Sequence, residues 1–376
     1  MVEIVEVKSK KQKKLFAAFP VKLYKDCPYY VPSIRNDDED ILDKKKNACL
    51  SECDCKCFLA YKDGKLVGRI AGIIHRNANK LFGTKNIRFS RFEAIDDIEV
   101  FKALLDAVEN YGKQEGLDAI HGPWGFNDTD REGMLTYGFD RVSTYATNYS
   151  YPYFAENMKK LGWGDESKWV EYEFEIPTEP FEKIDRLSEK LKKKYNLRDV
   201  AEEMSVSQIV KKYGNKFFET YNEAYGHLDE YCAVSPETQK SILGSFGMII
   251  NPRYFSLLVD ENDEVAGAAV VFPSLRKPLI KHKGKVIPFG IFSFLRAVNK
   301  PKELEMAIIG VKHKYRNSGI NAVLMSRIIN NIIEDGITNL ESNPMLEHNY
   351  EIQANWKFSN TKIVKKRQTF VKKIEN

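Results

Sequence analysis

Hydrophobic residues recur at the spacing of helices and strands in both halves of the chain. Apolar pairs repeat every four residues within Asn317–Glu334, and Phe, Leu and Val side chains recur at helical spacing in Glu99–Tyr111. Cys57–Ile74 consists of two apolar runs joined by an Asp-Gly turn, the pattern of a β-hairpin. Each half gives a strand, helices, a hairpin, a strand, a long helix and a strand. This order predicts an α/β protein with a mixed α+β sheet and a weak internal duplication.

Pro177–Pro180, with its two prolines, is the best linker in this pattern. Since 376 residues suffice for two domains of ordinary size, we expect an N-terminal domain over 1–176 and a C-terminal domain over 177–376. Thr361–Lys373 is predicted as a terminal strand or hairpin. We interpret its basic residues as the solvated side of an edge strand.

Charge and composition narrow the classes of protein. Lys and Arg total 58 against 53 Asp and Glu, so the formal net charge is +5. We expect no nucleic-acid partner from this mild excess, which is compatible with an anionic small ligand. No apolar run is long enough to span a bilayer, and the start lacks a secretory apolar segment. We therefore expect a cytoplasmic protein with no membrane partner, and the sequence leaves its oligomeric state open.

Four of the six cysteines lie between Cys49 and Cys57. Every second residue of Cys53–Cys57 is Cys, which favours small reduced thiols along one face of a strand. A metal site is the alternative, but the spacing differs from the usual Cys-x-x-Cys pairs and no second pair follows. We therefore expect no metal.

The polar segment from Asn127 to Tyr153 is rich in Gly and Tyr and has little periodicity. Long irregular segments in compact proteins are often binding loops. The alternative is a structured loop whose aromatic side chains simply pack on the domain. On the first interpretation, Tyr145, Tyr149 and Tyr151 contact a substrate.

A strand, a basic loop with glycine and an amphipathic helix follow one another within Ile308–Leu324. The first backbone N–H groups of a helix are free to bind an anion, and the helix dipole favours it. Gly319 allows close approach of the backbone to a ligand. Basic side chains add positive potential at Lys312, His313, Lys314 and Arg316. These features alone predict a phosphate or pyrophosphate site.

This segment resembles the acyl-CoA pyrophosphate loop of the GNAT acyltransferase superfamily, whose pattern is Gln/Arg-x-x-Gly-x-Gly/Ala between the fourth strand and third helix. Here it reads Arg316-Asn-Ser-Gly319-Ile-Asn321, and Asn321 replaces the family's Gly or Ala. The preceding Gly310–Arg316 resembles the family's Gly-Val-x-Pro-x-Tyr-Arg, with His313 in place of Pro.

The resemblance implies that the chain contains two tandem GNAT-like acyl-CoA N-acyltransferase folds, like tandem bacterial proteins whose N-terminal half is degenerate. It implies acetyl-CoA, or another acyl-CoA, as co-substrate. Val311 would polarise the thioester carbonyl through its N–H, and Asn349 resembles the family's Asn near the pantetheine arm. The implied cofactor-binding residues are Val311, His313, Arg316, Asn317, Ser318, Gly319, Ile320, Asn321 and Asn349.

Glu305 lies on the strand before the loop, where some GNAT members place a general base. The alternative is an ordinary Glu facing solvent. The family often uses a Tyr in the helix after the fifth strand as general acid. We predict that helix at Asn349–Trp356, where Gln353 occupies the family position and Tyr350 lies one turn earlier.

The equivalent junction of the first half, Phe92–Glu99, contains no Gly and carries four carboxylates. These charges would repel a pyrophosphate, so we expect only the second half to bind CoA. The most direct function is acyl transfer, with acetyl as the expected group, to an amine of a small molecule or peptide. The alternatives are a non-catalytic acyl-CoA sensor or scaffold, and a Fem-like aminoacyl transferase with a tRNA-binding face.

Overall fold

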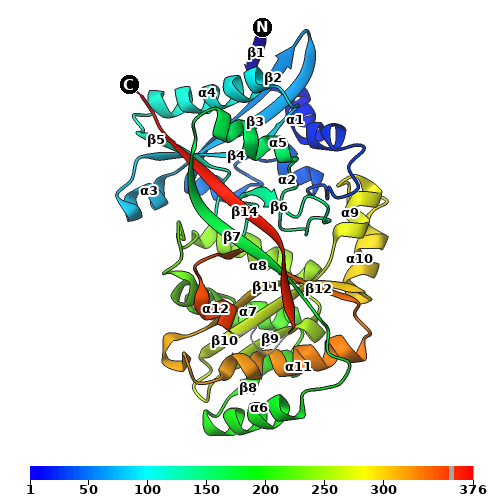
Figure 1. Cartoon of the computed structure of the whole chain (residues 1–376). Coiled ribbons are helices and arrows are strands. Elements are labelled where there is room, and N and C mark those ends of the chain that lie inside the picture. Colours follow the sequence, from blue (N-terminus) through cyan, green and yellow to red (C-terminus); the bar gives the residue numbers. More distant parts are fainter. Residues whose placement is uncertain (355–359, 376) are drawn as a thin grey trace.

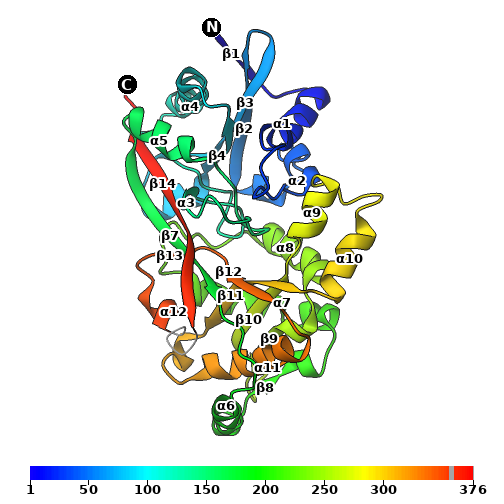
Figure 2. The same cartoon turned by 45° about the vertical axis from the view of Figure 1, so that its right-hand side comes forward.

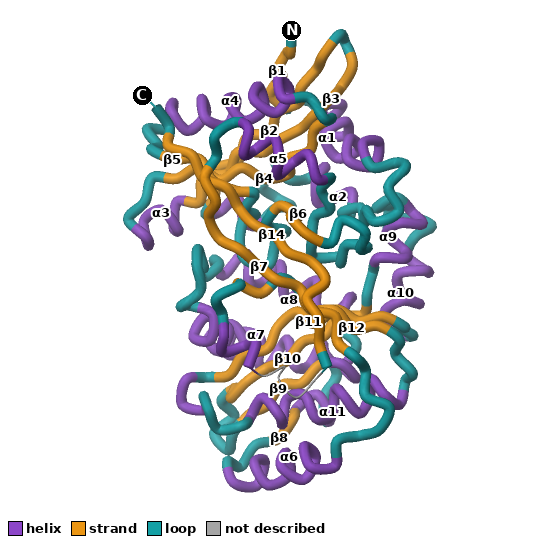
Figure 3. Tube along the Cα trace, in the orientation of Figure 1, coloured by secondary structure: helices purple, strands orange, loops and turns teal. Residues whose placement is uncertain are grey.

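One continuous sheet joins the two halves of the molecule (Figure 1, Figure 3). The computed structural model describes residues 1–354 and 360–375. The strands are β1 (Val2–Glu6), β2 (Cys53–Lys62), β3 (Lys65–His75), β4 (Asn86–Ala94), β5 (Ala119–Gly122), β6 (Met134–Tyr137), β7 (Gly164–Phe174), β8 (Arg198–Asp199), β9 (Phe255–Val259), β10 (Val265–Pro273), β11 (Glu303–Val311), β12 (Asn339–Ser342), β13 (Met345–Leu346) and β14 (Thr361–Lys373). Their order is β1-β2-β3-β4-β5-β14-β7-β12-β11-β10-β9-β8, with β6 beside β14 and β13 beside β7.

Helices cover both faces of the sheet in the first half. They are needed there because successive side chains of β3 point to opposite faces and are apolar on both. Ile70 packs in the cluster beneath the longest helix of this half, while the next residue, Ala71, packs on the opposite side with Phe16. The helices of this half are α1 (Lys10–Leu23), α2 (Arg35–Glu39), α3 (Arg76–Phe82), α4 (Ile98–Gln114) and α5 (Pro152–Lys160).

The second half repeats this construction. Ala269 of β10 faces the cluster beneath its long amphipathic helix, and Val270 faces the opposite cluster. The helices of this half are α6 (Glu182–Lys194), α7 (Val206–Tyr225), α8 (Pro236–Ile249), α9 (Arg276–His282), α10 (Ile291–Asn299), α11 (Ile320–Glu334) and α12 (Tyr350–Ala354).

The internal duplication is confirmed at the level of strand pairing. In the first half, β4 is followed by α4 and by β5, which pairs with β4 in parallel. In the second half, β11 is followed by α11 and by β12, which pairs with β11 in parallel. The predicted mixed α/β fold class is therefore confirmed.

The terminal strand β14 lies in the middle of the sheet. It pairs antiparallel with β5 of the first half and with β7, and Lys365 and Arg367 are buried there. The interpretation of this segment as a solvated edge strand is wrong, because strands cover both of its edges. The boundary between 176 and 177 stays a prediction, since a strand from the second segment completes the sheet of the first.

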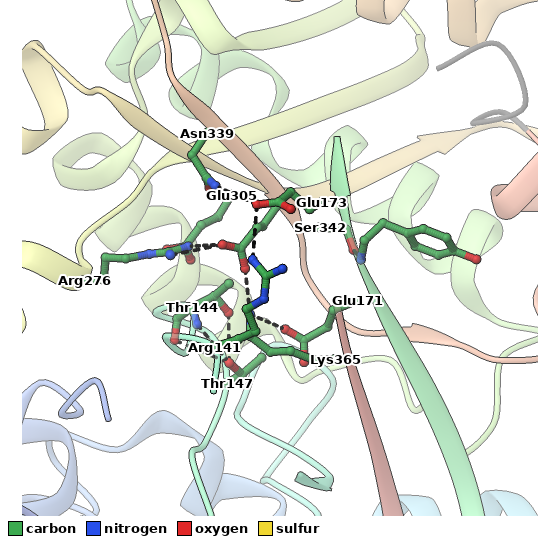
Figure 4. Close-up of polar contacts among 12 residues, drawn as sticks. Arg141, Thr144, Thr147, Glu171, Glu173, Arg276, Glu305, Asn339, Ser342 and Lys365 are labelled. Carbon is green, nitrogen blue, oxygen red and sulfur yellow. Dashed lines mark hydrogen bonds and ion pairs between the residues drawn. The ribbon is translucent and has the colours of Figure 1, made fainter. Parts of the chain in front are cut away.

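Buried ion pairs hold this crossing strand (Figure 4). Lys365 Nζ lies 2.6 Å from a Glu341 carboxylate oxygen and 3.3 Å from one of Glu171. Arg367 Nε lies 2.5 Å from the other oxygen of Glu171. Arg276 of α9 lies 3.0 Å from Glu341. Each buried charge thus meets an opposite charge, which is the condition for tolerating charges in a low-dielectric interior.

The cysteine-rich segment forms β2, as its alternation predicts. Cys53 and Cys57 are buried, and both pack with Cys55 in the cluster shared with α1. The described part of the chain contains no group of three or more His, Cys, Asp or Glu residues that could hold a metal ion. Nor do the described residues include a helix long and apolar enough to cross a membrane.

Candidate active site

The parallel strands β11 and β12 separate part-way along their length. Their pairing runs only from Glu303 to Met306, whereas the pairing of β11 with β10 continues to Val311. Along β10, Val270 is paired with Ile308 and Val271 with Met306, so one residue of β11, Ala307, is bulged out of register. A bulge bends a strand and interrupts pairing. The last residues of β11 consequently have one edge that β12 does not cover.

A cavity of about 1730 Å³ lies at this opening, and both halves of the chain line it. Its walls include the end of β11, the start of α11, the loop after β12 and part of the irregular segment after Asn127. The structure brings ten of the sequence-predicted residues to the cavity. They are Tyr145, Glu305, Val311, Arg316, Asn317, Gly319, Ile320, Asn321, Asn349 and Tyr350.

The loop before α11 is shaped by two residues with left-handed backbone. Asn317 has φ +58° and Gly319 has φ +85°, so the helix begins at Ile320 and not at Asn317 as predicted. A Cβ at position 319 would be strained by this φ and would lie 3.2 Å from the Leu191 side chain. Glycine thus leaves the N-terminus of a 15-residue helix open toward the cavity.

Acidic neighbours neutralise much of the positive charge expected in this loop. Lys312 pairs with Glu264 at 3.3 Å and Lys314 pairs with Asp260 at 2.9 Å. Arg316 differs, since its guanidinium donates to a backbone carbonyl, Ala224 O at 3.4 Å, and pairs with no carboxylate among the described residues.

Two predicted cofactor residues of this loop make local contacts. The backbone N–H of His313 donates to the Glu223 carboxylate, and the Ser318 hydroxyl donates to Tyr315 O at 2.5 Å. Neither residue is part of the cavity wall. A cavity-bound ligand therefore meets Arg316 and the helix N-terminus rather than these two side chains.

Beyond Met306, the backbone of β11 does not pair with β12 along its uncovered edge. Lys312 N–H donates to Ala266 O of β10, so strand alternation points the N–H of Val311 to the other edge. On that edge, Tyr225 of α7 donates to Ile309 O and accepts from Ile309 N–H, both at 3.3 Å. The N–H of Val311 is thus directed toward the side on which the cavity lies.

Glu305 is buried. The alternative interpretation, an ordinary Glu that faces solvent, is therefore wrong. Its side chain is 2% exposed, and its two carboxylate oxygens accept from Tyr145 N–H at 2.9 Å and Ser274 Oγ at 2.7 Å. Arg276 lies 3.8 Å away (Figure 4). Burial raises the pKa of Glu305 although Arg276 opposes the shift. The carboxyl group fastens the Tyr145 loop of the first half to β11.

Comparisons with known proteins place this geometry in context. No family model matches the chain. Protein YghO of Escherichia coli K12 is 25% identical over 331 residues, which cover 85% of this chain and 81% of that protein. The bacterial ceramide synthase of Caulobacter vibrioides is 23% identical over 322 residues, covering 84% and 82% respectively.

Among solved structures, a tandem GNAT protein from the clavulanic acid biosynthesis pathway superposes with a TM-score of 0.61 at 10% identity. The match covers 100% of this chain and 99% of that one. The chain has the tandem GNAT fold. A GCN5-related N-acetyltransferase from Sphaerobacter thermophilus matches over 99% of this chain and 96% of its own, with a TM-score of 0.52 at 9% identity.

In this tandem GNAT fold the two halves differ at the equivalent helix N-terminus. Asp97 caps α4 by accepting from the N–H groups of Glu99 and Val100, and Lys62 lies 2.6 Å from its carboxylate. The N-terminus of α4 is therefore occupied by a side chain of the protein itself, whereas α11 begins at a glycine.

The tandem arrangement adds carboxyl groups that the sequence analysis missed. Asp128 and Glu132, from the loop between β5 and β6, line the cavity. Burial raises the pKa of Asp128 to about 6, although Tyr221 donates a hydrogen bond to it. Burial, followed by the charge of Asp128, raises the pKa of Glu132 well above its usual range. The charge of Arg88 opposes this rise, but no hydrogen bond from the described residues to the Glu132 carboxyl does so.

Two of the three tyrosines assigned to the substrate lie elsewhere. Tyr149 packs edge-on against Tyr24 and Tyr151, with ring centroids 5.7 and 5.6 Å apart, and its hydroxyl donates to Phe139 O. Neither Tyr149 nor Tyr151 is part of the cavity wall. The packing interpretation describes these two residues, while Tyr145 does line the cavity.

The segment after β12 positions one predicted residue and exposes another. Asn349 accepts from Ile352 N–H at 3.3 Å and so supports the start of α12. Tyr350 lines the cavity but is 74% exposed. Gln353 binds the carbonyls of Leu346 and Glu347, which is a structural contact. The predicted helix end at Trp356 lies outside the described residues.

Proposed function

We propose that this chain is an acyl-CoA-dependent N-acyltransferase. The observation that carries the proposal is the separation of β11 from β12 beside an open helix N-terminus, within a cavity that the first half closes. The second half would hold acyl-CoA, and the amine would enter between the halves. The capped N-terminus of α4 supports acyl-CoA binding by the second half alone.

The residues around α11 fit an acyl-CoA. The helix N-terminus, Gly319 and Arg316 would bind the pyrophosphate, with Asn317, Ile320 and Asn321 forming the rest of the loop. The N–H of Val311 would donate to the thioester carbonyl, and Asn349 would lie beside the pantetheine arm. Since hydrogen-bond donors aimed at a developing oxyanion lower the barrier, Val311 is the electrophilic group of the site.

Proton transfer needs a base on the acceptor side. The amine must lose a proton as its nitrogen attacks the carbonyl carbon and the carbon–sulfur bond breaks, and the departing thiolate must gain one. We assign the base to Glu132, because its carboxyl lies in the cavity, is unpartnered among the described residues and has a raised pKa. Glu305 is the second choice, since both of its oxygens already accept hydrogen bonds. Tyr350 stays the proposed acid.

The cavity favours an amine with an apolar chain. Its volume of about 1730 Å³ exceeds the ~300–1,000 Å³ of ordinary small-molecule pockets. The carboxyl groups of Asp128 and Glu132 suit an ammonium group. Elsewhere, the part of the wall formed by α8 and β10 is apolar. That apolar wall consists of Ile242, Phe246, Ile249 and Phe272. One relative is named a ceramide synthase, and a ceramide is an N-acylated long-chain amino alcohol. We therefore propose a long-chain amine, and an acyl group longer than acetyl, in preference to an acetyl transfer to a peptide.

Release of free CoA thiol tests this function. The full chain is mixed with acetyl-CoA or palmitoyl-CoA and with a long-chain amino alcohol, a short amine or a peptide. Thiol release that depends on the long-chain amine, together with the amide product by mass spectrometry, is the expected result. Binding of acyl-CoA without turnover for any amine would instead favour the sensor, and turnover only with an aminoacyl-tRNA would favour the Fem-like alternative.

A further inference from the structure

An apolar tip projects from the second half, outside the duplicated core. It is carried by α9 and α10, which are inserted between β10 and β11 and stand off the sheet (Figure 2). The inner face of α10 is packed by Phe294 and Val298, whereas the outer side chains lie in solvent. The exposed side chains of this apolar tip are Ile287 (73%), Phe289 (83%), Phe292 (78%) and Leu295 (46%).

The charged residues of the inserted segment itself are all basic. The sequence contains no Asp or Glu between Glu264 and Glu303, the stretch that includes both helices. Among the described residues, Lys281, Lys283 and Lys285 pair with no carboxylate, and Arg296 and Lys300 add two more unpaired cations. An exposed aromatic face that adjoins a cluster of unpaired lysine and arginine residues is typical of segments that lie in the interface of an anionic bilayer.

A basic pocket lies at the base of the same hairpin. It has a volume of about 430 Å³ and forms between α1 and the turn after α9. Its charged lining consists of Lys22, Lys25, Arg35, Lys281, Lys283 and Lys285. Arg35 pairs with Glu39 and Lys25 with the exposed Asp26, and the other four lysines lack a carboxylate partner within the described residues. The basic pocket can therefore take a phosphate group.

The hairpin is fixed to the body of the protein. His282 Nε2 and Ser293 Oγ lie 2.7 Å apart and join α9 to α10. Arg35 N–H donates to Gly284 O at 2.9 Å, which attaches the turn to the first half. A rigid support lets the apolar tip and the basic pocket meet one surface together.

The hairpin also borders the cavity. Tyr145 and Ile249, which line the cavity, pack in the same hydrophobic cluster as Phe294 and Val298. A lipid surface at the outer face of the hairpin would therefore lie one helix away from the cavity wall. This arrangement suits a substrate that resides in a bilayer, a point that rests on the proposed function.

We propose that the α9–α10 hairpin docks the protein on the surface of a bilayer that contains anionic phospholipid. Ile287, Phe289 and Phe292 enter the interface, and the basic pocket binds a lipid phosphate. This proposal departs from the expectation of no membrane partner, which rested on the lack of a spanning segment.

Vesicle sedimentation tests the docking with the full chain and without acyl-CoA, so its failure is distinct from failure of the proposed function. We expect binding to vesicles with about one third phosphatidylglycerol in phosphatidylcholine, and binding at least about tenfold weaker to pure phosphatidylcholine. Phe289→Ser with Phe292→Ser should weaken binding about tenfold or more, as should Lys281→Glu with Lys283→Glu.

The matched control is Leu81→Ser with Phe82→Ser on α3, whose side chains are also exposed and which lies on the other side of the molecule in Figure 1. This control should bind as the wild type does. Absence of binding to anionic vesicles would overturn the proposal, and so would tip variants that bind unchanged. Loss of a dimer in the tip variants, without vesicle binding, would identify a protein interface instead. Competition by inorganic phosphate with no dependence on the tip would reduce the site to a free-phosphate pocket.

Discussion

Glu132 is the proposed base of the mechanism. Its side chain lines the cavity, its pKa is raised, and it has no hydrogen-bond partner among the described residues. Burial and a neighbouring like charge are means by which enzymes raise the pKa of a carboxylate that acts as a base. Sequence reasoning could not single it out, because Glu132 lies in an irregular loop that comes from the half without a glycine loop.

Replacing Glu132 separates catalysis from binding. Glu132→Gln should lower kcat by ~10²–10⁴-fold with little change in acyl-CoA affinity. Thiol release and calorimetry measure the two quantities, and Glu156→Gln, on the exposed face of α5, is the control. A Glu132→Gln enzyme with wild-type turnover would remove this residue from the mechanism and leave Glu305.

The same carboxyl has a predictable effect on stability. Because its folded-state pKa is raised, the folded chain binds this proton more tightly than the unfolded chain does, and stability falls as pH rises from the ordinary Glu value toward the raised one. Glu132→Gln, which resembles the protonated form, should therefore raise Tm at neutral pH. The gain should vanish below the ordinary Glu pKa, and a gain that persists unchanged in acid would contradict the assignment.

At the scale of elements, the crossing strand β14 depends on buried charge pairs. Lys365 is the cation between Glu171 and Glu341, and all three are buried. Lys365→Met should cost ~3–5 kcal/mol in free energy of unfolding, since Glu171 and Glu341 lose the buried cation that they share and each keeps a single arginine partner. Lys362→Met, on the exposed side of the same strand, should cost less than ~1 kcal/mol. Equal losses in urea unfolding would contradict the account.

Sequence patterns predicted the elements with local signals and missed those fixed by distant contacts. The hairpin of β2 and β3 and the helices α4 and α11 follow from turns and periodicity. The course of β14 could not be predicted, because its neighbours β5 and β7 lie far away in sequence. The α9–α10 hairpin was also missed, since apolar residues such as Phe292 and Phe294 occur on both its outer and inner faces.

The sequence predicted the proposed acyl-CoA side of the site but not the acceptor side. Gly319, Arg316 and the start of α11 follow from one contiguous motif, and the structure brings them to the cavity. The acceptor side could not be derived in this way, because it assembles from loops of the other half. Among its tyrosines, composition alone could not separate Tyr145, which lines the cavity, from Tyr149, which packs on its neighbours.

At the scale of the whole molecule, the continuous sheet predicts cooperative unfolding. The end of the chain completes the first half, and Arg88 pairs with Glu230 of the second half at 3.0 Å. Calorimetry should therefore show one transition for the full chain. A fragment of residues 1–176 should aggregate, since it would expose the β5 and β7 edges that β14 covers. Two separate transitions, or a monomeric folded fragment, would show independent domains.

Binding of acyl-CoA is the most direct test of the central claim, which is that the α11 N-terminus of the second half holds the co-substrate. Calorimetry would compare the wild type with Gly319→Asp, which adds a Cβ and a negative charge to the loop. The control is Gly336→Asp, at the other end of α11, where the backbone also has positive φ and the space is open. We predict micromolar binding for the wild type and the control, and a loss of at least about a hundredfold for Gly319→Asp. Unchanged binding by Gly319→Asp, or no binding of any acyl-CoA by the wild type, would contradict the account.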